Sequence, residues 1–258
     1  SKEEKKMKER FEKSKLENVE FVNMEVSSHA LHQKRVEKLE YDLISYTNIT
    51  RDHLDYHHTF KEYVDTKLSL TKHMKKDGKA IVNTDGIDLD KFNIDKKKII
   101  TYGFSEDADY TIKSINQSIY QMNFKIDTPE GEEISIYSSI IGKFNAYNIT
   151  NALIVCKEYG LTYDQIKHGI ITFKGVKGRF ELIPSSKALG FSVVIDFAHT
   201  PDALDKVLSN AKDIVKGRII LVFGAGGNAD VGKREIMGEI ASKYSDIIVL
   251  TTDDPKDE

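Results

Sequence analysis

The chain has 258 residues, of which 40% are hydrophobic and 31% are charged, a composition that can bury a core. Its formal net charge of -3 gives no support for a nucleic-acid or membrane partner, and no apolar run reaches the roughly 20 residues that span a bilayer. The single cysteine, Cys156, has no partner for an internal disulfide. We therefore expect a reducing, cytoplasmic setting, and a small core residue rather than a nucleophile at Cys156.

Alternating strand and helix patterns fill the first hundred residues. A charged, helix-like segment opens the chain, and a short strand is expected at residues 19–26. A second strand at 41–47 leads into the histidine-rich loop NITRDHLDYHHT, and helical spacing then covers residues 60–73. The compact apolar runs 79–83 and 98–104 are typical of buried parallel strands.

The middle of the chain changes to period-two alternation. Residues 109–137 predict antiparallel hairpin strands, joined by a turn at residues 128–131. A helix is expected at residues 144–159. A second helix begins at Thr162, where Gln165 completes a capping box.

The basic, glycine-containing segment KGVKGR is the best candidate for a domain boundary, so we divide the chain into residues 1–174 and 175–258. Strands and helices alternate after it, with Thr200 and Pro201 as the N-cap and first residue of one helix. The expected strands are 192–196, 218–223 and 246–251, and the expected helices are 202–215 and 233–244. The predicted fold class is α/β: a mostly parallel domain with an antiparallel hairpin subregion, followed by a Rossmann-like α/β unit. Neither end of the sequence resembles a domain boundary, so we expect a piece of a longer protein.

The glycine-rich stretch FGAGGNADVGKR permits three interpretations. Gly224, Gly226 and Ala229 fit the dinucleotide-binding pattern G-x-G-x-x-A between a strand and a helix. The same stretch nearly matches a P-loop that starts at Gly227, but Arg234 stands where Ser or Thr must ligate Mg²⁺. The plainest alternative is a flexible turn at a helix N-terminus that binds an anion.

A second group of polar residues lies upstream. Glu25 ends one expected strand, His53 follows the next, and Lys67 lies on the helix after it. Because parallel strands open on one crevice at their carboxyl ends, this pattern indicates a metal or phosphate site. The alternative for His53 is a capped loop histidine, and we expect His57 and His58 on the loop surface. The histidine spacing does not fit a structural zinc site.

Six segments then occur in a specific order: MEVSSHAL, TNITRDHLDYH, GKFNAYNITNAL, GVKGRFE, DFAHTPDAL and FGAGGNADVGKR. From about residue 19 onward they resemble the Mur ligase family. VSSHAL, TRDHLDYH and AHTPDAL favour the branch that adds the third residue of the peptidoglycan stem peptide. The resemblance implies a partial central ATP-binding domain over residues 1–174 and a truncated Rossmann-like ligase domain over residues 175–258.

The resemblance also implies an activity. Ligases of this family use ATP to convert a carboxylate to an acyl phosphate, which an amine then attacks to form an amide. The substrates would be a UDP-linked muramoyl dipeptide and an amino acid, and the protein would be a cytoplasmic monomer with ATP and Mg²⁺ as cofactors. Glu25 matches a Mg²⁺ ligand, His53 matches a ligand of a second Mg²⁺, and Lys67 matches a carbamylated lysine. A carbamate turns a cation into a hard oxygen ligand that suits Mg²⁺.

The remaining roles follow from the same resemblance. Asn148 matches an asparagine near adenine, with Asn145 beside it. Arg179 matches an arginine that reaches the ATP phosphates, and Asp196 matches an aspartate that holds the ribose. With His53 and Lys67, Arg179 forms the expected catalytic set, because phosphoryl transfer requires electrostatic stabilisation. The expected substrate-binding residues are His199, Gly227, Lys233, Arg234, Asp253, Asp254 and Lys256.

Two departures from the family pattern matter. The sequence contains neither the family's P-loop nor its N-terminal uridine-nucleotide domain, so we expect the 258 residues alone to be inactive. Diaminopimelate enzymes carry the motif D-N-P-R, whereas this chain has Asp253, Asp254, Pro255 and Lys256. Asp254 would attract a cationic amino acid such as lysine, although Lys256 opposes it. The acceptor therefore stays open between lysine and another diamino acid.

Three other functions remain open. The first is another Mur-like amide ligase, of folylpolyglutamate or cyanophycin type. The second is a dinucleotide-binding module built on residues 224–229, which titration with NAD and with ATP would separate from the ligases. The third is a non-catalytic piece or a degenerate paralogue.

Overall fold

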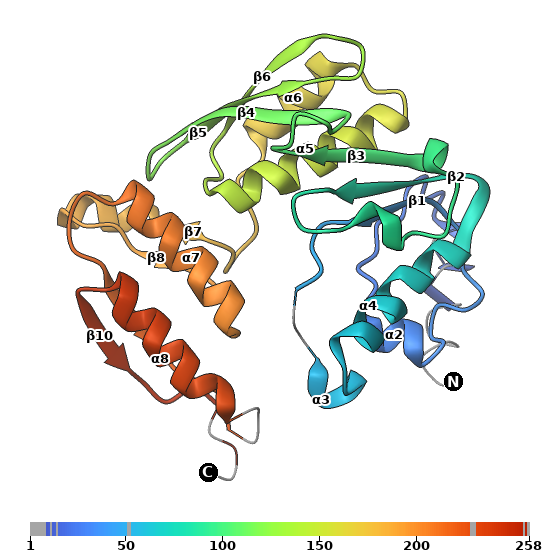
Figure 1. Cartoon of the computed structure of the whole chain (residues 1–258). Helices are drawn as coiled ribbons and strands as arrows, with labels where there is room; N and C mark the ends of the chain where they lie inside the picture. Colours follow the sequence, from blue (N-terminus) through green and yellow to red (C-terminus); the bar gives the residue numbers. More distant parts are fainter. Residues whose placement is uncertain are drawn as a thin grey trace. The chain divides into compact units, whose positions relative to one another are not determined.

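The computed structural model describes residues 9–10, 12–13, 15–50, 53–227, 231–254 and 256. The chain forms two compact units, Ser1–Thr101 and Tyr102–Glu258, which are described separately below (Figure 1). The predicted division after residue 174 stays a prediction. Within the described ranges, no helix is both long and apolar enough to cross a membrane.

A parallel strand pair forms the centre of the first unit. Strand β1 (Tyr41–Tyr46) pairs with β2 (Met74–Asn83), in a register that runs to Tyr46 opposite Val82. The side chain of Val82 is fully buried, as expected for a strand with both faces covered. Both predicted strands are confirmed, and β2 begins five residues earlier than predicted.

Short helices cover this pair. They are α2 (Ser28–His32), α3 (Leu54–His57) and α4 (Phe60–Leu68), and a 3₁₀ turn at Ser69–His73 continues α4. The core between helices and strands contains Leu31, Val36, Ile44, Tyr63, Val64, Leu70, Ala80 and Val82. The helix predicted at residues 60–73 is confirmed, whereas the loop predicted at residues 48–59 contains α3.

The strand predicted at residues 19–26 is wrong. These residues form no strand, and Val19, Phe21 and Val22 are exposed. Their alternating apolar pattern resembles a strand. A strand also needs a partner edge, which a local pattern cannot supply.

The second unit contains hairpin strands near its start. Strand β3 (Ile99–Gly103), which crosses the boundary between the two units, pairs in parallel with β4 (Tyr110–Gln117). Strands β5 (Met122–Asp127) and β6 (Glu133–Ser138) follow in antiparallel order. Buried and partly exposed side chains alternate along β5, and Phe124 is buried. The predicted period-two hairpins are therefore confirmed.

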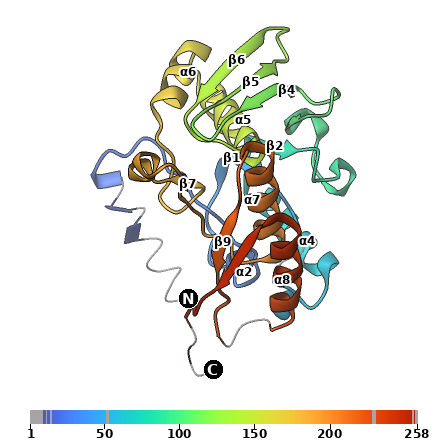
Figure 2. The same cartoon turned by 90° about the vertical axis from the view of Figure 1, so that its left-hand side faces the viewer.

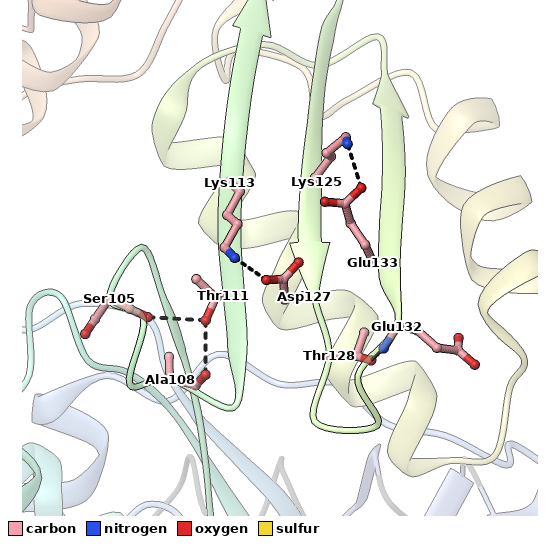
Figure 3. A network of polar contacts seen from close by, with 9 residues as sticks. All are labelled: Ser105, Ala108, Thr111, Lys113, Lys125, Asp127, Thr128, Glu132 and Glu133. Carbon is pink, nitrogen blue, oxygen red and sulfur yellow. Dashed lines mark hydrogen bonds and ion pairs between the residues drawn. The ribbon is translucent and has the colours of Figure 1, made fainter.

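Charged pairs link the exposed faces of these strands (Figure 3). Lys113 on β4 binds Asp127 on β5, and Lys125 on β5 binds Glu133 on β6 with Nζ and Oε1 2.6 Å apart. Each pair is diagonal in the register, so it favours one alignment of the strands. Because each of the four side chains is at least 40% exposed, the pairs specify register more than they add stability.

Two helices follow the hairpins. Helix α5 covers Lys143–Glu158, and α6 covers Tyr163–Thr172. The predicted capping box is present: the Thr162 hydroxyl accepts from the backbone N–H of Gln165, whose side chain accepts from the N–H of Thr162. Gly160, between the helices, has a φ of +86°, which glycine adopts without strain.

The C-terminal part of the second unit is a small α/β layer. Strands β9 (Ile220–Phe223) and β10 (Ile247–Leu250) are parallel, and helices α7 (Pro201–Ile214) and α8 (Gly232–Tyr244) lie side by side (Figures 1 and 2). Their shared core contains Leu204, Leu208, Ile219, Met237, Leu221 and Phe223. The predicted cap at Thr200 and the proline start of α7 are confirmed.

One predicted strand of this part is shorter than expected. Only Val194–Ile195 of residues 192–196 form a strand, β8, which pairs antiparallel with β7 (Glu181–Leu182). The Rossmann-like alternation therefore begins at α7. With this difference, the predicted α/β class is confirmed.

Candidate functional site

His53 and Lys67 face the same aromatic ring in the first unit. Tyr63 and Lys67 lie four residues apart on α4, so their side chains share one helix face. The Lys67 Nζ lies 5.3 Å from the centroid of the Tyr63 ring. The centroid of the His53 ring lies 6.3 Å from that of the same tyrosine ring. The structure thus places His53 and Lys67 beside one ring, and their shared role in a metal site stays a prediction.

Glu25 lies on the segment that leads into α2. It is exposed, and it precedes Ser27, whose hydroxyl caps α2 by accepting from the N–H of Ala30 at 3.2 Å. The position of α2 therefore determines where the backbone of Glu25 lies, and with it the region that the Glu25 carboxylate can reach. A Mg²⁺-binding role for Glu25 stays a prediction.

The surface position predicted for His57 is wrong. The residue is 1% exposed, and its Nε2 lies 2.9 Å from the hydroxyl of Ser28, which is equally buried. Burial, followed by the neighbouring imidazoles of His29 and His32, lowers the pKa of His57. His57 is therefore a buried imidazole whose surroundings favour the neutral form. His58, by contrast, is exposed as predicted.

Three neighbouring rings pack around His57: the ring centroids of Tyr56, His29 and His32 lie 4.9, 5.8 and 6.0 Å from that of His57. The Tyr56 hydroxyl lies 2.9 Å from Nδ1 of His32. The ring centroid of His29 lies 4.1 Å from that of Tyr56 and 4.7 Å from that of His53. We call the set Ser28, His29, His32, Tyr56 and His57 the α2–α3 seam. Sequence reasoning missed it, although HLDYH places His57 one helical turn after His53.

Three candidate metal ligands lie in the first unit: Glu25, His53 and Lys67. Among the residues that the structure describes, no three His, Cys, Asp or Glu side chains gather closely enough to hold a metal ion. Magnesium sites do not need such a cluster, because one or two carboxylates are commonly completed by phosphates and water. Glu25 and a carbamylated Lys67 would be two such anionic oxygen donors, whereas an ammonium at Lys67 would repel the cation. A metal-binding role for Glu25, His53 and Lys67 stays a prediction.

The two predicted adenine-site residues are linked on α5. The side-chain amide of Asn145 donates to the carbonyl of Ile141 at 2.7 Å, and its Oδ1 accepts from Nδ2 of Asn148 at 3.2 Å. The pair is spaced three residues apart on one helix face, with Asn148 exposed. This face can offer amide groups to a base edge.

Hydrogen bonds to the side chain of Asn210 join the start of α5 to α7. Oδ1 of Asn210 on α7 accepts from Nε2 of Gln117 at 3.2 Å and from the backbone N–H of Lys143 at 3.3 Å. Gly142 precedes α5 with a φ of +108°, and a Cβ there would lie 3.0 Å from the Asn210 amide. Only glycine fits this junction without strain.

Arg179 and Asp196 lie on adjoining segments. The Arg179 guanidinium carbon lies 4.5 Å from the centroid of the Phe197 ring, and Arg179 is exposed. Both carboxylate oxygens of Asp196 accept backbone N–H groups at 2.7 Å, from Phe180 and Ala198. Asp196 therefore shapes this loop, and its predicted role with ribose would be an additional one.

The predicted substrate residues gather around the turn after β9. The N–H of Gly227 donates to the carbonyl of Asp254 at 2.7 Å. A Cβ at Gly224 would lie 2.4 Å from the carbonyl oxygen of Thr251. A glycine is thus needed at position 224 because the segment after β10 packs against the turn. This packing explains Gly224 without a bound dinucleotide. Ala229, the third position of that pattern, lies outside the described residues.

Cationic side chains border the same turn. Nζ of Lys233 donates to the carbonyl of His199 at 3.0 Å, and Nη2 of Arg234 lies 3.5 Å from the carbonyl oxygen of Gly226. Both cations are half-buried, whereas His199 is exposed.

The acidic segment after β10 completes the group. Asp253, Asp254 and Lys256 are exposed, while Pro255 lies outside the described residues. Positive and negative groups thus border one turn, as a zwitterionic ligand requires.

Comparisons with known proteins match both halves of the chain. Residues 2–156 match the family described as Mur ligase middle domain, and residues 178–258 match the Mur ligase, glutamate ligase domain. Two relatives carry the name UDP-N-acetylmuramoyl-L-alanyl-D-glutamate--2,6-diaminopimelate ligase. The protein of Bacillus velezensis is 38% identical, with 96% of this chain and 51% of the relative covered. The protein of Aquifex aeolicus is 40% identical, with coverages of 91% and 47%.

Solved structures agree with these relatives. A structure with the same ligase name superposes with a TM-score of 0.65 at 32% identity, over 90% of this chain and 48% of the other. The MurF ligase of Thermotoga maritima in complex with ADP gives a TM-score of 0.69, at 20% identity, over 89% of this chain and 56% of the other, a likeness of fold alone. The chain spans about half the length of the curated relatives it matches. These matches cover both halves and include relatives well above 30% identity, so the chain belongs to the Mur ligase family.

Proposed function

We propose that the chain is part of an ATP-dependent ligase that joins a diamino acid to a UDP-linked muramoyl dipeptide during peptidoglycan synthesis. The observation that carries this proposal is the continuous likeness, at 35–40% identity over more than 90% of the chain, to ligases named for that reaction. We place the enzyme in the cytoplasm as a monomer.

The first unit would hold the metal that accompanies ATP. Glu25, His53 and carbamylated Lys67 would bind Mg²⁺, which neutralises charge on the transferred phosphoryl group. Tyr63 supports this assignment, because its ring lies against both His53 and Lys67. These 258 residues contain no P-loop, so that element would come from another part of the enzyme.

The second unit would bind the nucleotide and assist the transfer. Asn145 and Asn148 would offer their amides to adenine, and Asp196 would accept from the ribose. Arg179 is exposed on the loop beside Asp196, so its guanidinium can move toward a phosphate without leaving a buried position. Its charge would stabilise the phosphoryl group and then the acyl phosphate, whose carbonyl the incoming amine attacks.

The turn after β9 would bind the incoming amino acid. A diamino acid carries at least one ammonium group and one carboxylate. The carboxylates of Asp253 and Asp254 would attract the ammonium groups, while Lys233 and Arg234 would attract a carboxylate. The relatives' names favour diaminopimelate. Asp254, where diaminopimelate enzymes carry Asn, would repel its second carboxylate and favours lysine.

A ligation assay tests the proposal. An enzyme of the relatives' length that carries this chain is incubated with ATP, Mg²⁺, the UDP-linked dipeptide and either L-lysine or diaminopimelate. We expect ADP, phosphate and a product heavier by one diamino-acid residue, and a Glu25→Ala variant should lose at least 100-fold in rate. Nucleotide turnover without amide formation with either amino acid would contradict the proposal. The 258-residue chain alone should not turn over ATP.

A further inference from the structure

His57 lies where three segments of the first unit meet. Its Nε2 bonds the hydroxyl of Ser28, three residues after Glu25. Its backbone N–H donates to the carbonyl of His53 at 2.9 Å. Its ring centroid lies 5.5 Å from that of Tyr63, the ring over which Lys67 Nζ lies. One buried residue therefore contacts the segment or the neighbour of each proposed metal ligand, through its ring to Ser28 and Tyr63 and through its backbone to His53.

We propose that His57 is a positioning residue that fixes the spacing of Glu25, His53 and Lys67 through its buried bond to Ser28. The inference rests on the proposed function, because it concerns the same metal site. His57 does not itself bind the metal. It holds the first turn of α2 against the turn that begins at His53.

The bond between His57 and Ser28 can hold α2 in place because both side chains are buried and have few rotatable bonds. Ser28 and His57 are both 1% exposed, so water cannot replace either partner when the bond is lost. Ser28 is the first residue of α2, so a shift of its hydroxyl moves the cap at Ser27 and the extended residues before it. The other seam residues are less buried and leave more freedom, because His29 and Tyr56 are partly exposed and His32 is exposed.

The alternative is that His57 only fills space in the core. A space-filling role predicts lost stability with unchanged metal geometry. A positioning role predicts weaker metal binding beyond any loss of stability, and rescue by a side chain that restores the bond. These outcomes can be separated, because ligand-positioning contacts commonly change metal affinity by about 10- to 100-fold.

The experiment measures Mn²⁺ binding by electron paramagnetic resonance, with a non-hydrolysable ATP analogue, in a ligase of the relatives' length that carries this chain. His57→Phe keeps an aromatic ring but removes the bond, and Ser28→Ala removes the partner with little change in volume. His57→Gln places an amide near the position of Nε2. Val82→Ala is the control, because it truncates a fully buried core residue on β2 that is not part of the seam.

We expect His57→Phe and Ser28→Ala each to raise the Mn²⁺ dissociation constant about tenfold. The double variant should be no weaker than either single one, because both remove the same bond. His57→Gln should return to within about threefold of wild type, and Val82→Ala should lower the melting temperature without changing Mn²⁺ affinity.

Wild-type Mn²⁺ affinity in Ser28→Ala, or an equal loss in Val82→Ala, would overturn the inference. Ser28→Ala keeps the test valid even where His57→Phe does not fold. A Glu25→Ala variant is measured in parallel. If its Mn²⁺ affinity equals that of wild type, the proposed metal site itself is wrong, and that failure is distinct from failure of the His57 assignment alone.

Discussion

Gly224→Ala should destabilise the turn around which the proposed amino-acid site is built. The new methyl group would lie 2.4 Å from the carbonyl oxygen of Thr251 and 3.0 Å from the backbone nitrogen of Asp253. Ordinary contacts of this kind exceed 3.4 Å. The segment after β10 must therefore move by about 1 Å, since both obstacles are backbone atoms that cannot rotate away.

The size of the effect follows from two opposing terms. Overpacking of this kind costs about 1–3 kcal/mol, and the reduced freedom of the unfolded chain returns about 0.4–1 kcal/mol. The midpoints of these ranges, about 2.0 and 0.7 kcal/mol, leave a net loss of about 1.3 kcal/mol, which lowers the melting temperature by about 3–5 °C for a chain of this size. Gly226→Ala is the matched control, because its methyl group would lie 3.8 Å from the nearest heavy atom, the carbonyl oxygen of Asp254.

Circular dichroism or calorimetry is the suitable assay, because the chain contains no tryptophan. We expect Gly224→Ala to melt clearly below wild type and Gly226→Ala to melt within about 2 °C of it. In the full-length ligase, Gly224→Ala should also raise the KM for the amino acid more than the KM for ATP. Equal melting temperatures for wild type and Gly224→Ala would refute the packing argument.

Three further predictions concern other parts of the chain. Lys67→Ala should inactivate the full-length ligase, with partial recovery on adding small carboxylic acids; full activity without an additive would exclude a carbamate. Arg179→Ala should lower kcat more than it raises the KM for ATP, and an unchanged kcat would make Arg179 a ground-state contact only. Leu208→Ala should lower the unfolding free energy by about 2–5 kcal/mol in urea titrations, because Leu208 is 3% exposed in the α7–α8 core.

Local patterns in the sequence were sufficient to predict most of the fold. The capping box at Thr162, the proline start of α7 and the alternation along β5 are set by neighbours within a few residues, so they can be predicted without tertiary knowledge. Residues 19–26 carry an equally strong local pattern. They form no strand, because pairing depends on which edge lies nearby in space.

The candidate site was only partly predictable for the same reason. The sequence orders Glu25, His53 and Lys67 along consecutive segments, and the structure brings the last two to the ring of Tyr63. The burial of His57 was missed, because its partner Ser28 lies 29 residues away and no local rule links the two. Helical spacing from His53 to His57 was the one signal that could have indicated it.

Transfer of ¹⁸O tests the central claim most directly. A ligase of the relatives' length that carries this chain is given the UDP-linked dipeptide labelled with ¹⁸O in its terminal carboxylates, together with ATP, Mg²⁺ and the accepted diamino acid. An acyl-phosphate route moves one labelled oxygen into inorganic phosphate for each amide formed. We predict phosphate carrying one ¹⁸O in wild type and none above background in Glu25→Ala. Amide product formed with unlabelled phosphate, or with AMP in place of ADP, would contradict the account.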